Sequence, residues 1–498
     1  MYLLGFDVGT SSVKASLINA ATGVCAASDY FPKQEMKMKA VKPGWAEQDP
    51  ELWWHNLCMA SASVLANSGI DRDQVRAIGI SYQMHGLVMV DKHYNVLRPS
   101  IIWCDSRAVG YGDEAAKVLG ADICHNHLLN SPGNFTASKL AWVKEHEPEI
   151  YSKIYKVMLP GDFIAMRMTG EIQTTIPGLS EGIMWDFKRE VISKEMLDYF
   201  GFSSSILPDI VPTFSKQAGL SADGAFALGL KQGTPVCYRA GDQANNALSL
   251  NVFKPGEVAS TAGTSGVIYG VLDKLTHDAQ NRVNLFAHVN HKIDDPRLGM
   301  LLCINGTGSM NAWIKKQISP DGITYDVMNM MADAIPIGSN GVSILPFGNG
   351  AERVLENRET GAVFSGINFN VHTRAHLFRA VQEGIVFAMK YGLDIMQELG
   401  LKATTIRAGA ANMYMSDIFG KTMATLAGVP IELYETNGAA GAAKGAGIGA
   451  GIYADSDDAF AKLQKIDTIE PDMAHIEEYR EAYERWKELL KNVLATLQ

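Results

Sequence analysis

Two aspartates stand beside glycine where an apolar stretch ends. Asp7 follows the apolar residues 2–6, and Asp242 follows the apolar run 235–238 and Gly241. A carboxylate at the end of a buried strand can hold Mg²⁺, directly or through water, because this ion prefers oxygen ligands. It can also accept the proton of an attacking hydroxyl. Structural roles stay open for both: Asp7 could be a turn residue that bonds its own backbone, and Asp242 could cap a helix.

A short motif of glycine, threonine and serine occurs twice, about half the chain apart. The copies read Gly9-Thr10-Ser11-Ser12-Val13 and Gly263-Thr264-Ser265-Gly266-Val267. Glycine permits close backbone approach, consecutive N–H groups form a nest for anions, and Lys14 adds a positive charge. One such loop is typical of an ordinary hairpin. The matched pair favours the binding of nucleotide phosphates and a duplicated domain plan.

The elements around the first motif predict an unusual phosphate site. Residues 2–6, 13–18 and 24–30 read as three successive strands, with a tight loop at residues 7–12. The glycine loop therefore lies in a hairpin of a β-meander. In dinucleotide-binding and P-loop sites it leads into a helix instead, and the spacing GxxxxGK[ST] is absent here. Further along, strands and helices alternate, which predicts an α/β fold.

Length and composition indicate a globular protein of two domains. The chain has 498 residues, of which 47% are hydrophobic and 20% charged. A single core stops growing at roughly 250–300 residues. Because the second motif lies just past the middle, we expect domains at residues 1–250 and 251–498.

Charge and cysteine usage exclude several classes of protein. The formal net charge of −10 argues against a nucleic-acid or anionic-membrane partner. The six cysteines form no CxxC pair, so we expect reduced thiols in a cytoplasmic protein. No apolar run reaches the roughly 18 residues that a membrane span needs. A homodimer is the assembly to test, since dimers are the commonest oligomers of soluble proteins.

Ordered matches along almost the whole chain identify a family resemblance. They are Asp7-Val8-Gly9-Thr10-Ser11, Trp45-Ala46-Glu47-Gln48-Asp49-Pro50, Gln83-Met84-His85-Gly86, Trp103-Cys104-Asp105-Ser106-Arg107, Lys139-Leu140-Ala141-Trp142, Leu159-Pro160-Gly161-Asp162, Gly241-Asp242 and Gly263-Thr264-Ser265-Gly266. With these motifs the chain resembles the FGGY family of carbohydrate kinases. Within that family it is most similar to the xylulokinases, to which the Gln-Met-His-Gly stretch points.

The resemblance implies a two-domain fold related to actin and hexokinase. Each half would have a ribonuclease-H-like core, and the active site would lie in the cleft between them. It also implies ATP with Mg²⁺ as cofactor and phosphorylation of a terminal sugar hydroxyl. The alternatives are another sugar of the family, such as ribulose, gluconate or glycerol, and a nucleotide switch of the actin or chaperone type that modifies no sugar.

The resemblance also assigns roles residue by residue. Asp242 matches the general base, for which we expect an ordinary carboxyl pKa near 4, and Asp7 matches the carboxylate near the metal and phosphates. The sugar-contacting positions are Met84 and His85, with Asp242, Gln243 and Trp103 as further expected contacts of xylulose. The adenosine loop falls on Gly409, Ala410 and Asn412. Departures from the family pattern are Gln243, where xylulokinases usually have Asn, and Tyr82, where a small residue is common.

Overall fold

The first half of the chain forms a mixed sheet of six strands. The computed structural model describes residues 1–319 and 322–497. The sheet has the order β13-β14-β5-β1-β2-β3. Its strands are β1 (Tyr2–Val8), β2 (Val13–Asn19), β3 (Cys25–Phe31), β5 (Val75–Tyr82), β13 (Ala218–Gly219) and β14 (Pro235–Gly241). Strands β1, β2 and β3 form an antiparallel meander, whereas β5 runs parallel to β1 and β14 runs parallel to β5.

The second half forms a sheet of seven strands in the order β17-β18-β16-β15-β21-β22-β23. Its strands are β15 (Glu257–Ala262), β16 (Gly266–Leu272), β17 (Asn284–Ala287), β18 (Leu298–Ile304), β21 (Thr405–Gly409), β22 (Ile431–Tyr434) and β23 (Lys465–Ile469). Strands β15, β16 and β18 are antiparallel neighbours, and β21 and β22 continue the sheet in parallel with β15.

Both sheets therefore repeat one plan, a three-stranded meander extended by two parallel strands. The first Gly-Thr-Ser motif joins β1 to β2, and the second joins β15 to β16. The two-domain α/β fold predicted from the sequence is confirmed. One local expectation was wrong: Asp7 lies within β1 and pairs with Lys14, because β1 continues for two residues beyond the predicted strand end.

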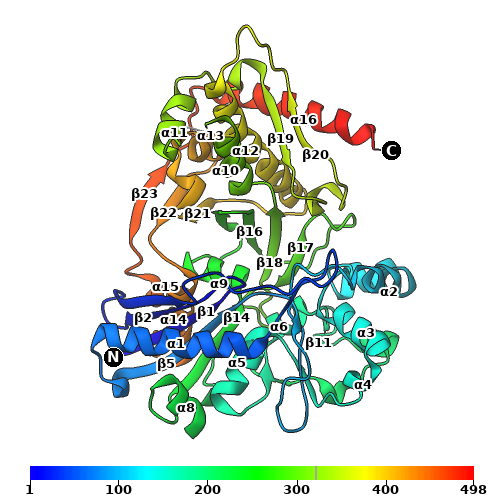
Figure 1. The fold of residues 1–498 in the computed structure, drawn as a ribbon, viewed down its shortest axis with the longest axis vertical. Helices are drawn as coiled ribbons and strands as arrows, with labels where there is room; N and C mark the ends of the chain where they lie inside the picture. The colour runs from blue at the N-terminus through cyan, green and yellow to red at the C-terminus, as the bar shows by residue number, and fades with distance from the viewer. Residues whose placement is uncertain (320–321, 498) are drawn as a thin grey trace.

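Helices cover both faces of the sheets (Figure 1). The first part of the chain contributes α1 (Pro50–Ser68), α2 (Val109–Asp122), α3 (Thr136–His146), α4 (Pro148–Tyr151), α5 (Pro160–Thr169), α6 (Ile176–Glu181), α7 (Lys194–Phe200), α8 (Ala222–Leu228) and α9 (Asp242–Ser249). The later part contributes α10 (Gly308–Ile318), α11 (Tyr325–Asp333), α12 (Arg374–Glu398), α13 (Asp417–Ala427), α14 (Gly438–Gly449), α15 (Ser456–Phe460) and α16 (Ile476–Ala495).

Short two-stranded ribbons complete the fold. They are β4 (Glu47–Gln48) with β7 (Ser100–Ile101), β6 (Val88–Val90) with β8 (Lys156–Met158), β9 (Gln173–Thr174) with β12 (Asp209–Ile210), β10 (Trp185–Asp186) with β11 (Val191–Ile192), and β19 (Ser343–Phe347) with β20 (Gly361–Ser365). Within the described residues, no helix is long and apolar enough to cross a membrane.

The first sheet buries different side chains on its two faces, as the alternation along a strand requires. Leu4 and Phe6 of β1 belong to the core that contains Trp53 of α1. Leu3 belongs to a second core, which contains Leu248 of α9 and residues of β15 and β16. Helix α9 thus packs between the two sheets, so its first residue, Asp242, stands where the two halves of the chain meet.

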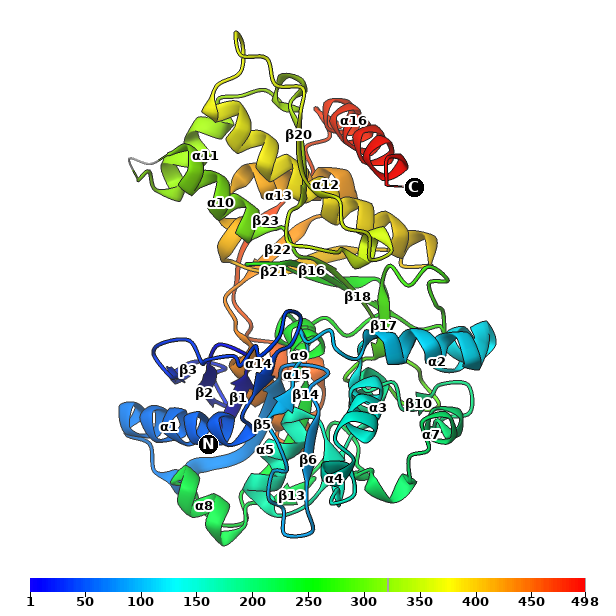
Figure 2. The ribbon, with the colours of Figure 1, turned by 45° about the vertical axis from the view of Figure 1, so that its right-hand side comes forward.

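A helix from the end of the chain returns to the first sheet. The alanine- and glycine-rich α14 packs on β1 and β5 and lies beside α9 (Figure 2). The backbones touch: a Cβ on Gly5 would lie 1.9 Å from the carbonyl oxygen of Ala439, and one on Gly79 would lie 1.9 Å from that of Ala442. The domain division at residue 250 stays a proposal, and it would separate this helix from the strands on which it packs.

Gly79→Ala is expected to lower the free energy of unfolding by about 1–3 kcal/mol, because the added methyl group overlaps a helix backbone that cannot move alone. The thermal unfolding midpoint measures the effect. Gly110→Ala is the matched control, since Gly110 is a helical residue whose Cβ would meet nothing within 4 Å. Equal midpoints for the two variants would contradict the proposed close packing of α14.

Candidate active site

A cavity of about 430 Å³ lies between the two halves of the chain. The first half lines it with Thr10, Met84, His85, Trp103, Asn134, Phe135, Asp242 and Gln243. The second half lines it with Ser265, Val267, Asn284, Leu301, Cys303, Asn305, Ala351, Glu352, Arg353 and Asn357. The structure thus brings seven of the predicted site residues to one cavity, although they come from distant parts of the chain.

Three parallel strands explain why the first-half residues meet. Strands β1, β5 and β14 run in the same direction, so their carboxyl ends lie at one edge of the sheet. The Gly9 loop follows β1, Met84 and His85 follow β5, and Asp242 follows β14. The two strands also end at the same level, because Asp7 of β1 pairs with Ser81 of β5 and the last residue of β1, Val8, pairs with Tyr82, the last residue of β5.

The first Gly-Thr-Ser loop is held by a chain of side-chain hydrogen bonds. The Trp103 indole N–H donates to Thr10 Oγ1 at 2.9 Å, and that hydroxyl donates to Gln83 Oε1 at 3.2 Å. Gln83 Nε2 donates to Gln48 Oε1 at 3.1 Å, while Gln48 Nε2 donates to the Thr10 carbonyl at 2.7 Å. The closed network fixes the loop at the mouth of the cavity.

The second loop rests on the start of α10. The backbone N–H groups of Gly308 and Ser309 donate to the carbonyl oxygens of Gly263 and Thr264, at 2.9 and 3.1 Å. A Cβ on Gly263 would lie 3.7 Å from Asn412 Nδ2. Since β15 and β21 are parallel, their carboxyl ends share an edge, and this places Gly263 beside the segment that contains Gly409, Ala410 and Asn412.

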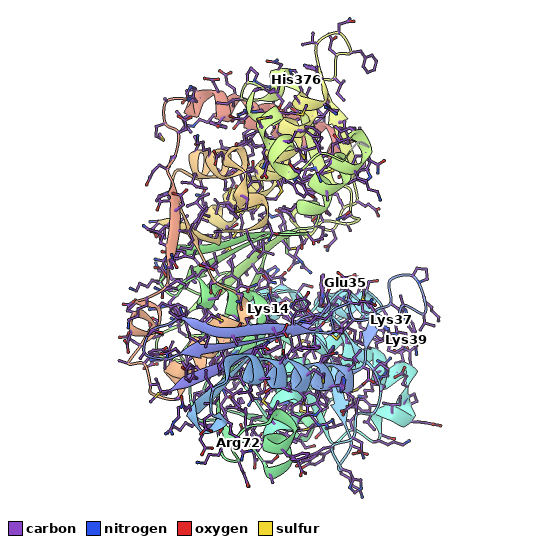
Figure 3. The ribbon with its side chains drawn as sticks, turned by 60° about the vertical axis from the view of Figure 1, so that its left-hand side comes forward. Lys14, Glu35, Lys37, Lys39, Arg72 and His376 are labelled. Carbon is purple, nitrogen blue, oxygen red and sulfur yellow. The ribbon has the colours of Figure 1, made fainter. Side chains whose placement is uncertain are left out.

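Lys14 lies on β2, opposite Asp7, on the border of the first half that faces the second (Figure 3). Its charge helps to hold down the pKa of Asp7, whereas burial, the larger effect, raises that pKa. Ser81 Oγ donates to Asp7 Oδ1 at 2.7 Å. The Asp7 carboxyl is therefore enclosed by protein, with a single hydrogen bond and a lysine on the neighbouring strand.

Asp242 is a stronger base than the sequence suggested. Burial, followed by repulsion from the charge of Asp7, raises its pKa from 3.8 to about 7. The expected pKa near 4 was therefore wrong, because sequence alone does not reveal that folding buries Asp242 near a second carboxyl group. Gln243 Nε2 donates to Asp242 Oδ1 at 3.2 Å and partly offsets the rise.

His85 is held in one tautomer. Its Nδ1–H donates to the carbonyl oxygen of Glu181 at 3.0 Å, and the Lys139 ammonium group donates to the His85 carbonyl at 2.8 Å. Burial lowers the pKa of His85 to about 3, so the ring is neutral near pH 7. With Nδ1 protonated, Nε2 is a hydrogen-bond acceptor for a ligand in the cavity.

Sequence reasoning missed several polar groups of the site. Glu181 is 2% exposed at the end of α6, and burial raises the pKa of its carboxyl group well above the ordinary range. Glu352 accepts from the backbone N–H of Asn305 at 3.1 Å, and burial raises its pKa to about 7. Arg353 follows Glu352 in the chain. None of these residues was among the site residues predicted from the sequence, because their importance comes from burial in the folded chain, which residue spacing does not show.

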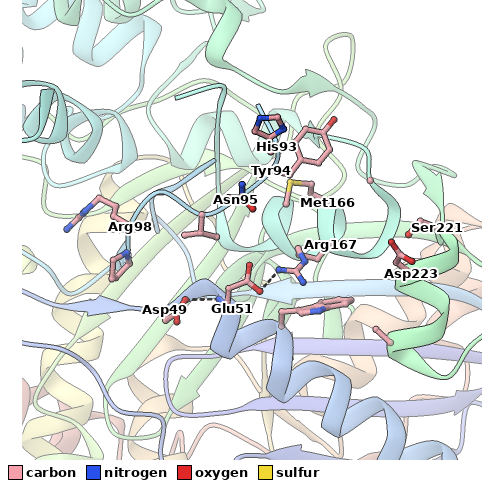
Figure 4. A pocket seen from close by; sticks show the side chains of 15 residues that line it. Asp49, Glu51, His93, Tyr94, Asn95, Arg98, Met166, Arg167, Ser221 and Asp223 are labelled. Atoms are coloured by element: carbon pink, nitrogen blue, oxygen red, sulfur yellow. Dashed lines mark hydrogen bonds and ion pairs between the residues drawn. The ribbon is translucent and has the colours of Figure 1, made fainter. Parts of the chain in front are cut away.

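Another hollow, of about 800 Å³, lies on the outer side of the first half (Figure 4). Among its charged lining residues, Glu51 and Arg167 form an ion pair. None of the predicted site residues lines it. Within residues 1–319 and 322–497, there is also no cluster of three histidine, cysteine or acidic side chains that could hold a metal. The cavity between the halves is therefore the candidate active site.

Comparison with protein families decides the class of this site. The model for the N-terminal domain of the FGGY family of carbohydrate kinases matches residues 2–249, and the model for its C-terminal domain matches residues 258–452. The chain belongs to the FGGY family of carbohydrate kinases. As an FGGY kinase it is a phosphotransferase with ATP and a carbohydrate as substrates. The alternative of a nucleotide switch that modifies no sugar is thereby set aside.

Individual relatives of this FGGY kinase share nearly its full length. The chain is 28% identical to xylulose kinase of Bacillus subtilis over 98% of this chain and 96% of the relative. It is 29% identical to xylulose kinase of Escherichia coli over 99% of both. The crystal structure of xylulose kinase from Rhodospirillum rubrum matches with a TM-score of 0.88, at 26% identity, over 99% of both chains.

Asp242→Asn is expected to stabilise this FGGY kinase above neutral pH. Between about pH 4 and 7 the folded carboxyl keeps a proton that the unfolded chain releases, so the free energy of unfolding falls as pH rises. Asparagine does not ionise, so the variant keeps its free energy of unfolding over this pH range. The variant should gain on the order of 1–3 kcal/mol at pH 8, after allowance for the part of the side chain that faces the cavity, and nothing near pH 4.

Thermal unfolding of ligand-free protein at both pH values measures this difference. Asp223→Asn, on the exposed start of α8, is the control and should leave stability unchanged. A variant of Asp242 that is less stable than the native chain at pH 8 would show that the carboxylate is stabilised by its surroundings.

Proposed function

We propose that this FGGY kinase transfers the γ-phosphoryl group of ATP to the terminal hydroxyl of D-xylulose, giving D-xylulose 5-phosphate. The observation that carries the proposal is the position of Asp242, a carboxylate of raised pKa that lines the cavity between the halves next to Met84 and His85. The choice of sugar is supported by the relatives named as xylulose kinases, which align over nearly the whole chain.

In this proposal the two Gly-Thr-Ser loops bind the phosphates of ATP from opposite sides. Gly9, Thr10, Ser11 and Lys14 contribute from the first half, and Gly263, Thr264 and Ser265 from the second. Gly409, Ala410 and Asn412 hold the adenosine, since they lie beside the second loop. Backbone N–H groups, hydroxyls and one ammonium group offset the negative charge of the phosphates.

The surroundings of Asp7 fit a magnesium ion. The carboxyl receives a hydrogen bond from Ser81, and burial raises its pKa by more than Ser81 and Lys14 together lower it. Mg²⁺ is commonly held by one or two carboxylates, substrate phosphates and waters, so Asp7 alone suffices from the protein side. When bound, Mg²⁺ neutralises charge on the transferred phosphoryl group.

Asp242 is the general base of the proposed reaction. Its carboxylate accepts the proton of the sugar hydroxyl as the hydroxyl oxygen forms a bond to the γ-phosphorus and the bond to ADP breaks. His85 Nε2 accepts a hydrogen bond from another sugar hydroxyl, and Gln243 and Trp103 contact the sugar near the reacting end. In this proposal, closure of the two halves over the substrates keeps water from the phosphoryl group, which limits wasteful hydrolysis of ATP.

Asp242→Asn is expected to lower kcat by about 10²- to 10⁴-fold, because the amide cannot accept the proton. Binding of ATP should stay within a few-fold of native, since Asp242 is assigned to the sugar side. A coupled ADP-release assay gives kcat, and calorimetry gives the affinity for ATP. Asp223→Asn serves again as the control, and near-native turnover by the Asp242 variant would remove Asp242 from the role of base.

Mass spectrometry of the products from ATP, Mg²⁺ and a sugar panel tests the choice of substrate. The panel contains xylulose, ribulose, gluconate and glycerol, and xylulose is expected to give the highest kcat/KM. A higher value for any other member would replace xylulose as the substrate while leaving the kinase assignment intact.

Assembly and location stay predictions of this proposal. Size-exclusion chromatography with light scattering tests the homodimer, and fractionation of the native cells tests the cytoplasmic location. Neither affects the assignment of the site, because both halves of the cavity come from one chain.

A further inference from the structure

Arg353 differs from the other enclosed arginines of this kinase in having no acidic partner. Arg107 pairs with Asp105 and Glu47, Arg239 with Asp162, and Arg379 with Glu383. For Arg353 no carboxylate lies within 4.0 Å among the residues that the structure describes. Its one side-chain hydrogen bond is long, from Nη1 to the carbonyl oxygen of Asn281 at 3.3 Å.

The neighbouring acid does not compensate this charge. The carboxyl group of Glu352 is used by the backbone N–H of Asn305, at 3.1 and 3.3 Å from its two oxygens. Burial lowers the pKa of Arg353, which reflects the cost of enclosing a cation without an anion. Because the side chain lines the cavity and makes a single hydrogen bond, its remaining N–H donors are left for a ligand.

Aromatic contacts place Arg353 beside Phe135 in the lining of the cavity. The rings of His85 and Phe135 lie 4.8 Å apart between centroids, and the guanidinium carbon of Arg353 lies 5.8 Å from the centroid of Phe135. On the other side, a Cβ on Gly241 would lie 2.6 Å from Met84 Cγ, so Asp242 stands next to Met84. The lining thus runs from Asp242 through Met84, His85 and Phe135 to Arg353.

We propose that Arg353 is a specificity-determining residue that binds the carbonyl-bearing end of the sugar, opposite the hydroxyl that faces Asp242. The assignment rests on the proposed sugar kinase function. The planar guanidinium offers two parallel N–H donors, which fit a carbonyl oxygen with a neighbouring hydroxyl, or a carboxylate. A polyol of the same length offers only hydroxyl oxygens at that end, which fit the planar pair of donors less well than a carbonyl or carboxylate oxygen does. We therefore expect a ketose or an aldonate to be preferred over a polyol.

The test compares each sugar with its reduced form. Xylulose is paired with xylitol and D-arabinitol, the two pentitols that reduction of its ketone gives. In the native chain, kcat/KM should favour xylulose over both pentitols. Arg353→Met should lower kcat/KM for xylulose by about 10- to 100-fold, mainly through KM, and change the values for the pentitols little. Arg353→Lys should recover part of the preference, because it keeps the charge without the planar pair of donors.

Arg358→Met is the matched control, since Arg358 lies in the same segment but pairs with Glu356 outside the cavity lining. It should leave the preference for xylulose unchanged. Equal losses for xylulose and the pentitols in Arg353→Met would assign Arg353 a structural role and overturn the proposal. A native preference for a pentitol would overturn it as well.

Gluconate separates the two sources of the carbonyl oxygen. A preference for gluconate that is lost in Arg353→Met would support the proposal with a carboxylate as the bound group. Calorimetric binding of the sugars alone separates this inference from the proposed function. If xylulose binds more tightly than the pentitols only when Arg353 is present, yet is not phosphorylated, the role of Arg353 stands and the proposed reaction fails.

Discussion

The parallel pairing of β1, β5 and β14 is the constraint on which the site depends. Parallel strands bring their carboxyl ends to one edge, so the loops that follow them must meet. The price of this arrangement is a very close helix contact, because α14 can cover these strands only where β1 and β5 carry glycine at Gly5 and Gly79. Packing of two backbones thus fixes the strands that position the proposed catalytic side chains.

The same edge concentrates negative charge. The charge of Asp7 raises the pKa of Asp242, and burial is the largest effect on the pKa of both carboxyl groups. Such an arrangement weakens the ligand-free fold. In the proposed function it also leaves a base matched to neutral pH and a carboxylate that gains from a bound cation, which is the usual exchange of stability for activity at an enzyme site.

The second half of the chain supplies the second Gly-Thr-Ser loop and the other part of the cavity lining. Its sheet repeats the same strand order, so its own Gly-Thr-Ser loop lies at an equivalent hairpin. Helix α9 packs against both sheets and carries Asp242 at its first turn. The cation of the sugar cavity, Arg353, also comes from this half. In the proposed function, binding of a sugar and a nucleotide therefore needs both halves, because neither half supplies all of the proposed site residues.

Motifs and periodicity in the sequence determined the α/β class, the repeated Gly-Thr-Ser loops, and the positions of Asp242, Met84 and His85 at strand ends. Such features are local, because neighbouring residues in the sequence determine turns, helix caps and the approximate ends of strands. Asp7 itself was assigned to the loop rather than to the strand, since a strand end depends on pairing with Lys14 across the sheet.

Only the tertiary structure determined the pKa of Asp242 and the surroundings of Arg353 in the cavity. The pKa of Asp242 depends on burial and on Asp7, which lies 235 residues away in the chain. The role proposed for Arg353 rests on two observations. Among the described residues no carboxylate pairs with its guanidinium group, and that group contacts the ring of Phe135. Chain spacing carries no information on either point, because solvent exclusion and charge pairing are set by segments that meet only when the two halves have folded together.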